Sequence, residues 1–275
     1  MAPAKIESLS RVLSFLGIIL DCELMEARLP ADKLTELRAL LQSASTTPTI
    51  SQRHLESLLG KLSFAARVII PGRTFMRRLW SVCSKFRKPH FIITLSQECR
   101  EDLRWWLKLL DGWNGKSFSL HPRWIPSPDL QLFTDASGTI GWGAFNHGKW
   151  TQGTWSPEQQ DYSIEWKELF ALVAACCTWG GDWAKLRILF HCDNMAVVDC
   201  MRSGTSKSPL VMSLLRELFF VCARCNFAVS ATHIAGNNNR IADSLSRFNM
   251  QEFRRLAPHA QAHPNQAQLP SHLQL

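Results

Sequence analysis

The sequence predicts an α/β protein in which a mixed five-stranded sheet flanked by helices follows a small, mainly helical region. Three observations support this. In the first 115 residues, apolar side chains recur mostly at the spacing of amphipathic helices. A stretch containing Gly and Pro, residues 116–129, then interrupts the pattern and is expected to be a linker. Beyond it, β-rich and helical segments follow the order β-β-β-α-β-α-α-β-α, which is typical of a mixed sheet covered by helices.

Residues 1–115 are expected to form a strand pair followed by a helical bundle. Residues 12–20 are β-rich and end at Asp21, and residues 24–29 follow, which favours a hairpin or short strand pair. Four helices are then expected, bounded by breakers such as Pro30 and the Pro71–Gly72 pair. They are residues 31–42, residues 51–68, a segment containing residues 75–82, and residues 96–113.

Residues 130–248 are expected to form the second domain. Its strands are predicted at residues 130–134, 141–145, 149–155, 186–191 and 227–233. Its helices are predicted at residues 164–178, 194–201, 209–224 and 238–247. Residues 249–275 become rich in Pro, Gln and His from Pro258 onward, a composition that predicts a disordered tail.

Positive charge is concentrated in the first part of the chain. The net charge is +8; residues 1–125 contain 19 basic and 11 acidic residues, whereas residues 126–275 contain 12 of each. No acidic residue lies between Glu56 and Glu98. Eight basic residues do: Lys61, Arg67, Arg73, Arg77, Arg78, Lys85, Arg87 and Lys88. Such a block favours a polyanionic partner such as nucleic acid, and a solvated helix face is the alternative.

The nine cysteines show no disulfide framework. Cys222 and Cys225 form one C-x-x-C pair without a second pair or a nearby His, so core thiols are expected. Reduced thiols and the lack of a signal-peptide pattern predict an intracellular protein, cytoplasmic or nuclear. No run of about 18 apolar residues occurs, so neither a membrane span nor a membrane partner is expected.

Four carboxylates stand at key positions of the predicted second domain: Asp135, Glu168, Asp193 and Asp243. Asp135 and Asp193 each follow a strand, and strand ends on one edge of a sheet converge. Carboxylates gathered in one place repel each other and need a cation, for which oxygen ligands suit Mg²⁺ or Mn²⁺. Two such ions would activate a water and stabilise the leaving oxygen of a phosphodiester.

Each of these residues also has a simpler structural explanation. An Asp after a strand commonly forms a turn or starts a helix, as Asp193 and Asn194 could do. Glu165 shares a helix face with Glu168, so the residues alone leave both as candidates. Trp142, in the Gly-rich hairpin beside Asp135, is a candidate for substrate contact, with core packing as the alternative.

Several motifs of this region occur together in a known family. They are TDAS (134–137), GWGA (141–144), E-L-x-A (168–171), HCDN (191–194) and HIAG-x-x-N-x-x-AD-x-LSR (233–247). By these motifs, residues 130–248 resemble the type 1 ribonuclease H domain of retroelement polymerases. Four upstream segments resemble the stretch after the polymerase active site in DIRS/Ngaro-type retrotransposons, which use a tyrosine recombinase. They are FLGIILD (15–21), RLPADKL (28–34), LLGKLSFAARVIIPGR (58–73) and DLRWWL (102–107).

The resemblance, which covers about residues 12–258, implies roles for individual residues. The four carboxylates Asp135, Glu168, Asp193 and Asp243 would bind two Mg²⁺ or Mn²⁺ ions, and the E-L-x-A pattern selects Glu168 over Glu165. His233 would transfer a proton to the leaving group or help product release. A His with a pKa near neutrality is suited to that task, although an idle loop His is the alternative. Ser137, Asn194 and Asn239 would be polar groups on the substrate side. The implied reaction is cleavage of the RNA strand of an RNA–DNA hybrid, leaving a 3′-hydroxyl and a 5′-phosphate.

The sequence departs from a complete polymerase of this kind. Its single tyrosine, Tyr162, is followed by Ser-Ile-Glu, and no Asp-Asp pair occurs, so no polymerase activity is expected. Residues 1–115 resemble the thumb and connecting region. Within them, Lys61, Arg67, Arg73, Arg77 and Arg78 would contact phosphates and set the register of a duplex. Other parts of a retroelement polymerase are possible partners. Two alternatives to the nuclease remain: a catalytically silent nucleic-acid-binding module, and a retroelement relic.

Overall fold

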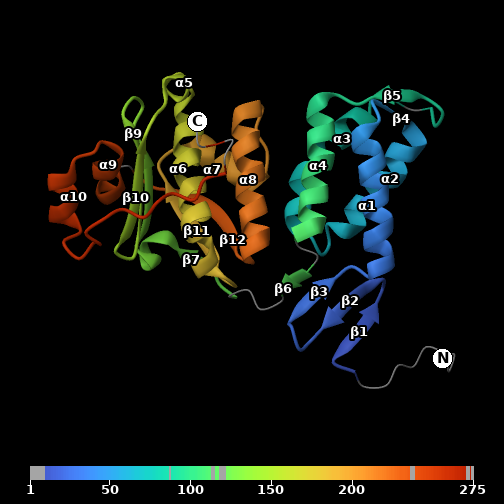
Figure 1. The fold of residues 1–275 in the computed structure, drawn as a ribbon, viewed down its shortest axis with the longest axis horizontal. Coiled ribbons are helices and arrows are strands. Elements are labelled where there is room, and N and C mark those ends of the chain that lie inside the picture. The colour runs from blue at the N-terminus through green and yellow to red at the C-terminus, as the bar shows by residue number, and fades with distance from the viewer. Residues whose placement is uncertain are drawn as a thin grey trace. The chain divides into compact units, whose positions relative to one another are not determined.

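The computed structural model describes residues 10–86, 88–112, 115–117, 122–235, 239–270 and 273. The chain divides into two units, residues 1–119 (unit 1) and residues 120–275 (unit 2), which are described separately below (Figure 1). The division falls within residues 116–129, the stretch expected to be a linker. In the described part of the chain, no helix has the length and apolar character needed to cross a membrane.

Unit 1 begins with an antiparallel sheet in the order β1-β2-β3-β6. Its strands are β1 (Val12–Phe15), β2 (Ile18–Asp21), β3 (Glu26–Arg28) and β6 (Gly115–Ser117). The β-rich run over residues 12–20 forms two strands rather than one, because Leu16 and Gly17 turn the chain with φ angles of 49° and 76°. The run expected to be a single strand is thus itself a hairpin; β3, within the expected residues 24–29, pairs with β2, and β6 extends the sheet.

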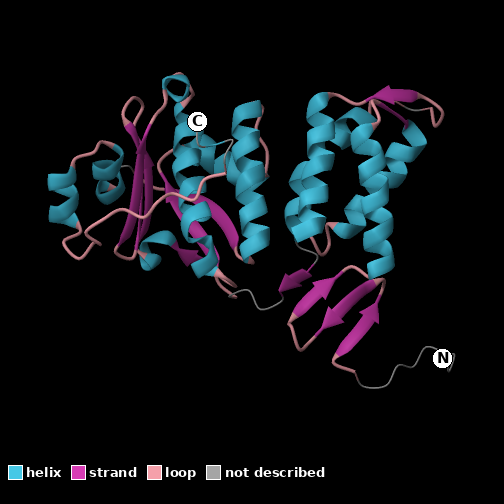
Figure 2. Cartoon of the chain, in the orientation of Figure 1, coloured by secondary structure: helices cyan, strands magenta, loops and turns pink. Residues whose placement is uncertain are grey.

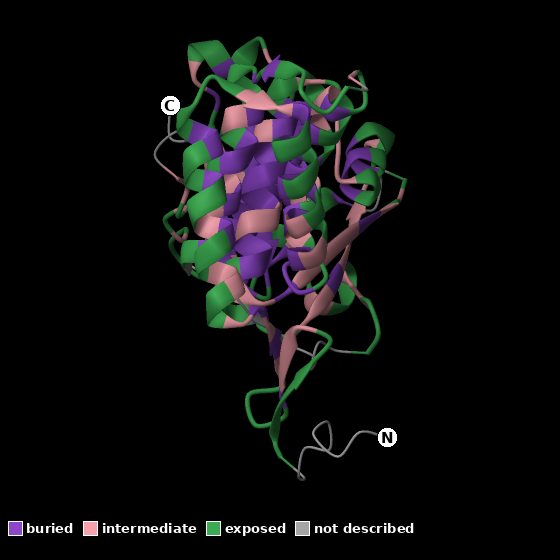
Figure 3. Cartoon of the chain, turned by 90° about the vertical axis from the view of Figure 1, so that its right-hand side faces the viewer, coloured by how far each residue is buried: buried purple, intermediate pink, exposed green. Residues whose placement is uncertain are grey.

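The four expected helices of unit 1 are also present. They are α1 (Ala31–Thr46), α2 (Gln52–Ala65), α3 (Arg77–Cys83) and α4 (Gln97–Gly112); the short strands β4 (Thr49–Ser51) and β5 (Ile92–Thr94) pair antiparallel beside them. Trp106 is fully buried, and a Cβ at Gly72 would lie 2.3 Å from its ring, so glycine permits this packing. Figure 3 shows buried positions gathered on the inner faces of the helices and exposed ones outside.

Unit 2 contains two ladders of three strands each. The antiparallel ladder consists of β10 (Lys149–Thr154), β9 (Gly141–Asn146) and β8 (Leu132–Ala136). The parallel ladder consists of β12 (Ala228–His233), β11 (Arg187–Cys192) and β7 (Ile125–Pro126). All five predicted strands are present, and β7 is an additional one.

The predicted five-stranded sheet is interrupted between β8 and β11, which are in contact but share no hydrogen-bonded ladder. Instead, β7 pairs with the first half of β11, where Ile125 lies opposite Ile188. Just after β7, the Ser127 hydroxyl accepts the backbone N–H of His191 at 3.1 Å. β7 and Ser127 thus bond to β11 on the side opposite β12.

Helices cover both faces of the antiparallel ladder (Figures 1 and 2). α6 (Ile164–Trp179) packs on β8 and β9 from one side and is itself covered by α8 (Pro209–Cys225), so almost all of its residues are buried. α9 (Arg240–Ser246) packs on the same two strands from the other side. The remaining helices are α5 (Pro157–Gln160), α7 (Met195–Ser203) and α10 (Met250–Leu256).

The prediction of a disordered tail over residues 249–275 is wrong for the described part of that segment. α10 forms first, and its Phe253 is fully buried against β10. The chain then follows β10: Asn265 N–H donates to the backbone O of Trp150 at 2.7 Å, and Trp150 Nε1–H donates to the backbone O of Gln261 at 2.8 Å. Leu273 is buried in the main core. Contacts with β10 and the core therefore order this segment, although its polar composition alone predicts disorder.

Candidate active site

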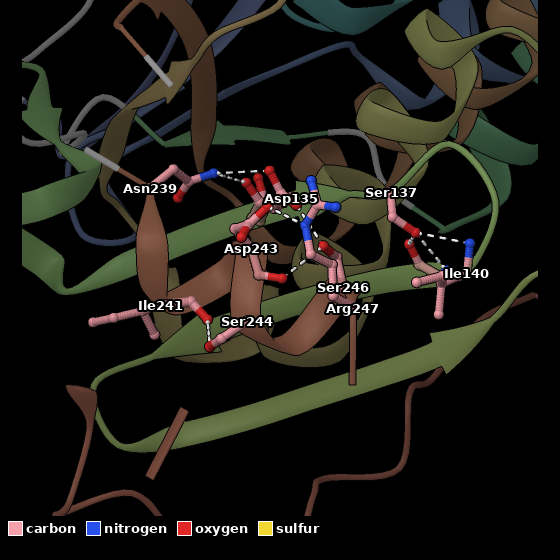
Figure 4. Close-up of polar contacts among 11 residues, drawn as sticks. Asp135, Ser137, Ile140, Asn239, Ile241, Asp243, Ser244, Ser246 and Arg247 are labelled. Carbon is pink, nitrogen blue, oxygen red and sulfur yellow. Dashed lines mark hydrogen bonds and ion pairs between the residues drawn. The ribbon is translucent and has the colours of Figure 1, made fainter. Parts of the chain in front are cut away.

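Asp135 is the fourth residue of β8 and is buried, with 7% of its surface exposed. Its cross-strand partner on β9 is Gly143, where an added Cβ would lie 2.3 Å from the Cβ of Leu245 on α9. Because Gly143 has no side chain, α9 can approach the sheet closely at this point. Asp243 and Ser246 of α9 consequently lie beside Asp135 (Figure 4).

Both carboxylate oxygens of Asp135 have polar partners. Ser246 Oγ–H donates to Oδ2 at 2.6 Å, and Asn239 Nδ2–H lies 3.4 Å from Oδ1. The same Asn239 amide donates to the backbone O of Thr134 at 2.8 Å. Ser246 is 0% exposed and Asn239 is 6% exposed, so two buried side chains fix the orientation of Asp135.

Asp243 lies on α9 and is about half exposed. Arg247, four residues later, donates from Nε to its Oδ1 at 2.6 Å, and the Arg247 side chain is 58% exposed. The positive charge of Arg247 also acts on Asp135. One guanidinium therefore compensates part of the negative charge at this edge of the sheet.

Glu168 and Asp193 complete the cluster from the other side. Glu168, on α6, is buried and accepts the backbone N–H of Ala136, whereas Asp193 follows β11 and is exposed. One ligand atom from each of Glu168, Asp193 and Cys192 lies within 4.8 Å of the other two. The charges of Asp135, Asp193 and Asp243 all act on Glu168. The structure therefore brings the four predicted carboxylates together.

Two of these carboxylic acids have strongly altered proton affinities. Burial, followed by repulsion from Asp135 and Asp193, raises the pKa of Glu168 to about 9. Burial is also the largest cause that raises the pKa of Asp135 to about 6, against the lowering effect of the Ser246 hydrogen bond. Burial is therefore the main cost of ionising these two acids, and repulsion within the cluster adds to it.

The raised pKa values predict a pH-dependent stability in the absence of divalent metal. Both acids bind protons more tightly when folded, so their contribution is complete below about pH 4 and is lost as the pH rises through about 6 and about 9. The melting temperature in EDTA should therefore fall by roughly 10 °C or more between pH 5 and pH 9. The Glu168→Gln variant should lose most of this slope in thermal melts followed by circular dichroism; an equally steep slope would contradict the assignment.

The donor set suits a hard divalent cation. Carboxylate oxygens are the ligands that Mg²⁺ and Mn²⁺ prefer, and a bound cation would relieve the repulsion that raises the pKa of Glu168. Cys192 is a poorer ligand, because burial raises the pKa of its thiol to about 12 and keeps it protonated. The ligands would accordingly be Asp135, Glu168, Asp193 and Asp243.

His233 is the last residue of β12 and is exposed. In the parallel pairing of β11 and β12 it lies opposite Cys192, the residue before Asp193. His233 is thus placed at the strand edge that carries Asp193. Residues 236–238 of the loop that follows lie outside the described residues.

Two of the polar residues expected on the substrate side form hydrogen bonds within the fold. Ser137 is buried, and its hydroxyl accepts the backbone N–H groups of Ile140 and Gly141 at 2.9 and 2.8 Å, which closes the β8–β9 turn (Figure 4). The Asn194 side chain accepts the N–H groups of Ala196 and Val197 and caps α7. Of the three expected substrate-side residues, Asn239 alone contacts a carboxylate of the cluster.

Trp142 is 4% exposed and packs edge-on against Phe170, so the expectation of substrate contact is wrong and core packing is correct.

Geometry also distinguishes the two glutamates, Glu165 and Glu168. Glu165 is half-buried and is not among the charges that act on Asp135 or Glu168. Glu168 is the member of the pair that faces the cluster.

Lys167, next to Glu168 in the sequence, is also buried. Its ammonium donates to the backbone oxygens of Gly138 and Gln160 at 2.6 and 2.7 Å and lies 5.9 Å from the centre of the Trp155 ring. One cation therefore ties the turn between β8 and β9 to the segment that precedes α6.

The five basic residues predicted to bind nucleic acid are not equivalent. Arg67, Arg73 and Arg77 are exposed. Lys61 forms an ion pair with Glu36 at 2.8 Å. Arg78 is half-buried, and its charge acts on Glu98 of α4. The candidate nucleic-acid surface of unit 1 thus consists chiefly of Arg67, Arg73 and Arg77.

Ser246 and Arg247 were not predicted as site residues, although both lie in the L-S-R end of the motif around Asp243. A serine at the end of a helix and an arginine one turn after an aspartate are common surface features. Only the packing of α9 on β8 and β9 shows that they meet two different carboxylates.

The sequence of residues 137–249 matches a protein family described as reverse transcriptase-like. None of the curated proteins matches this chain. The strand and helix order of unit 2, together with the family match, confirms the RNase H-like α/β fold class.

Among solved structures, similar chains include foamy viral protease-reverse transcriptase bound to double-stranded DNA (14% identity, TM-score 0.34, covering 82% of this chain and 38% of that one). Another is the foamy viral protease-reverse transcriptase in complex with an RNA/DNA hybrid (14% identity, TM-score 0.34, 81% and 29%). This chain spans less than half the length of either.

Proposed function

We propose that this chain is a metal-dependent endoribonuclease that cleaves the RNA strand of RNA–DNA hybrids, and that it is part of a retroelement polymerase of the DIRS/Ngaro type. The observation that carries the proposal is the convergence of Asp135, Glu168, Asp193 and Asp243, with Glu168 buried among the other three charges. A cluster of acids without a cation is costly to fold, so its presence favours metal-dependent chemistry over a purely structural role.

The four carboxylates would hold two Mg²⁺ or Mn²⁺ ions. When bound, the ions supply the Lewis acidity that activates a water and stabilises the leaving 3′-oxygen. Asp135, fixed by Ser246 and Asn239, provides the rigid side of the site, and the exposed Asp193 provides the open side. Exposure of Asp193 lets a phosphodiester approach from solvent.

Cleavage of an end-labelled RNA–DNA hybrid tests the proposal directly. RNA-strand products with Mg²⁺ or Mn²⁺, and none with EDTA, are expected. Double-stranded RNA and double-stranded DNA of the same sequence report the preference for the hybrid. A folded protein that binds the hybrid but never cuts it would favour the alternative of a silent binding module.

Replacing His233 by Ala should slow turnover by about 10–100-fold without abolishing it. The expectation follows from its place at the strand edge beside Asp193 and from the usual size of general acid–base contributions. Single-turnover and multiple-turnover rates on the hybrid separate proton transfer from product release. His191→Ala is a matched control on β11; an unchanged rate for His233→Ala would indicate an idle loop residue.

Replacing Arg73 and Arg77 together by Ala should weaken hybrid binding and reduce the slope of log K against log salt by about 1–2. Both side chains are exposed, so they are available to phosphates. Fluorescence anisotropy at several salt concentrations measures the slope. Lys61→Ala is the control, because that ammonium is already paired with Glu36. Equal slopes for the wild type, the double variant and Lys61→Ala would show that this surface is a solvated helix face rather than a nucleic-acid surface.

A further inference from the structure

Two neighbouring residues at the end of α9 contact two different carboxylates of the candidate site. Ser246 Oγ–H donates to Asp135 Oδ2 at 2.6 Å, and Arg247 Nε–H donates to Asp243 Oδ1 at 2.6 Å (Figure 4). The two contacts differ in burial. Ser246 is 0% exposed, whereas the side chains of Arg247 and Asp243 are 58% and 45% exposed. They are therefore expected to respond differently when a divalent cation arrives.

The Ser246 contact is a buried hydrogen bond to a carboxylate. Such bonds are short and stronger than neutral ones, and here Asn239 holds the opposite oxygen, so the carboxylate plane cannot turn freely. The Ser246 hydroxyl also lies 3.0 Å from the backbone O of Asp243, an alternative acceptor within its own helix. The shorter distance, to Asp135, identifies the carboxylate as the main partner.

The Arg247 contact is a surface ion pair within one helix turn. Pairs of this kind contribute little free energy and rearrange readily. Its guanidinium nevertheless adds a positive charge to a cluster of four acids, and that charge acts on Asp135 as well as on Asp243. A divalent cation that binds Asp243 must compete with this resident charge.

We propose that Ser246 and Arg247 are positioning residues with opposite effects on metal binding: Ser246 presets Asp135 for the cation, and Arg247 occupies Asp243 until the cation displaces it. The inference rests on the proposed metal-dependent function and adds how this site is prepared for its cofactor. Removing the Ser246 hydroxyl should weaken Mn²⁺ binding, and removing the Arg247 charge should strengthen it.

Titration of the full chain with Mn²⁺, followed by calorimetry and by the electron paramagnetic resonance of the free ion, tests this without substrate. Ser246→Ala should bind about 10-fold more weakly, in line with a lost hydrogen bond to a charged group, and Ser246→Thr should recover much of the loss. Arg247→Gln should bind about 2–5-fold more tightly, whereas Arg247→Lys should bind like the wild type.

Ser244 provides a matched control on the same helix. It is also buried, but its hydroxyl donates to the backbone O of Ile241 at 2.7 Å and does not contact a carboxylate (Figure 4). Ser244→Ala should therefore leave Mn²⁺ affinity unchanged even where it lowers the melting temperature in EDTA. A Ser246→Ala variant that binds like Ser244→Ala would overturn the role of Ser246.

The Arg247 variants keep the proposal testable if Ser246→Ala folds poorly. The Arg247 side chain is mostly exposed, so its replacement should not disturb folding. Weaker Mn²⁺ binding by Arg247→Gln would overturn the competition. The outcome is separable from the proposed function: if the wild type binds Mn²⁺ with these variant effects but never cuts a hybrid, the function fails and the inference stands. Absence of Mn²⁺ binding by the wild type would overturn both.

Discussion

The Asp193→Asn variant should lose cleavage of the RNA–DNA hybrid by at least about 10³-fold in either Mg²⁺ or Mn²⁺. Asp193 is the exposed carboxylate of the cluster, and one of its oxygens lies within 4.8 Å of a Glu168 oxygen. An amide of the same shape removes the negative charge that a divalent ion needs. The measurement is the initial rate on an end-labelled hybrid at saturating protein.

Asp199→Asn is the control for this variant. Asp199 is exposed on α7, in the same segment of the chain, and is not among the charges that act on Asp135 or Glu168. It should cut at the wild-type rate. Hybrid binding by Asp193→Asn in EDTA should be equal to or slightly tighter than that of the wild type, since one charge that repels phosphates is gone. Cleavage by Asp193→Asn at a rate close to the wild type would remove this residue from the site.

Deleting residues 258–275 should lower the melting temperature by roughly 10 °C, corresponding to about 3 kcal/mol or more in a domain of this size. The segment covers β10 through the contacts of Gln261 and Asn265 with Trp150, and Trp179 Nε1–H donates to Asn265 Oδ1 at 3.1 Å. Leu273 is buried in the core. Deletion removes these bonds and exposes two indole rings.

Thermal melts followed by circular dichroism measure this loss. Asn265→Ala should reproduce part of it, because it removes the side-chain oxygen that accepts the Trp179 indole N–H of α6 while keeping the backbone bond to Trp150. Gln266→Ala, next to it and exposed, should melt like the full chain. A truncated protein as stable as the full chain would show that the contacts of residues 258–275 do not stabilise the fold, as the polar composition of this segment predicts.

Local patterns were sufficient to predict most elements of the fold. The helix that carries Glu168 is a long apolar segment that begins after Ser163, and the strand that ends near Asp135 is followed by a Gly-containing turn; both elements are present in the structure. The interruption between β8 and β11 could not be predicted, because it involves β7 and the Ser127 hydroxyl, which bond to a strand far along the chain. The same applies to the tail, whose polar sequence is held by backbone bonds to β10.

The candidate site also has a part that the sequence predicts and a part that it does not. The four carboxylates could be identified from their motifs, since each stands at a recognisable strand end or on a recognisable helix face. Their partners could not: Ser137 and Ser246 are both serines within motifs, yet one closes a turn and the other holds Asp135. Which role a serine has depends on tertiary packing, in this case on how closely α9 approaches Gly143.

The buried ammonium of Lys167 has a consequence for covalent labelling. Amine-reactive reagents need an accessible nitrogen, and this one is enclosed and donates hydrogen bonds to the Gly138 and Gln160 carbonyls. Lys207 is exposed and should acylate more readily than Lys167. Acylation of Lys167 requires the β8–β9 turn to separate from α6, so its extent in peptide mass spectra should report local opening of the sheet edge next to Asp135 in a protein that is otherwise folded.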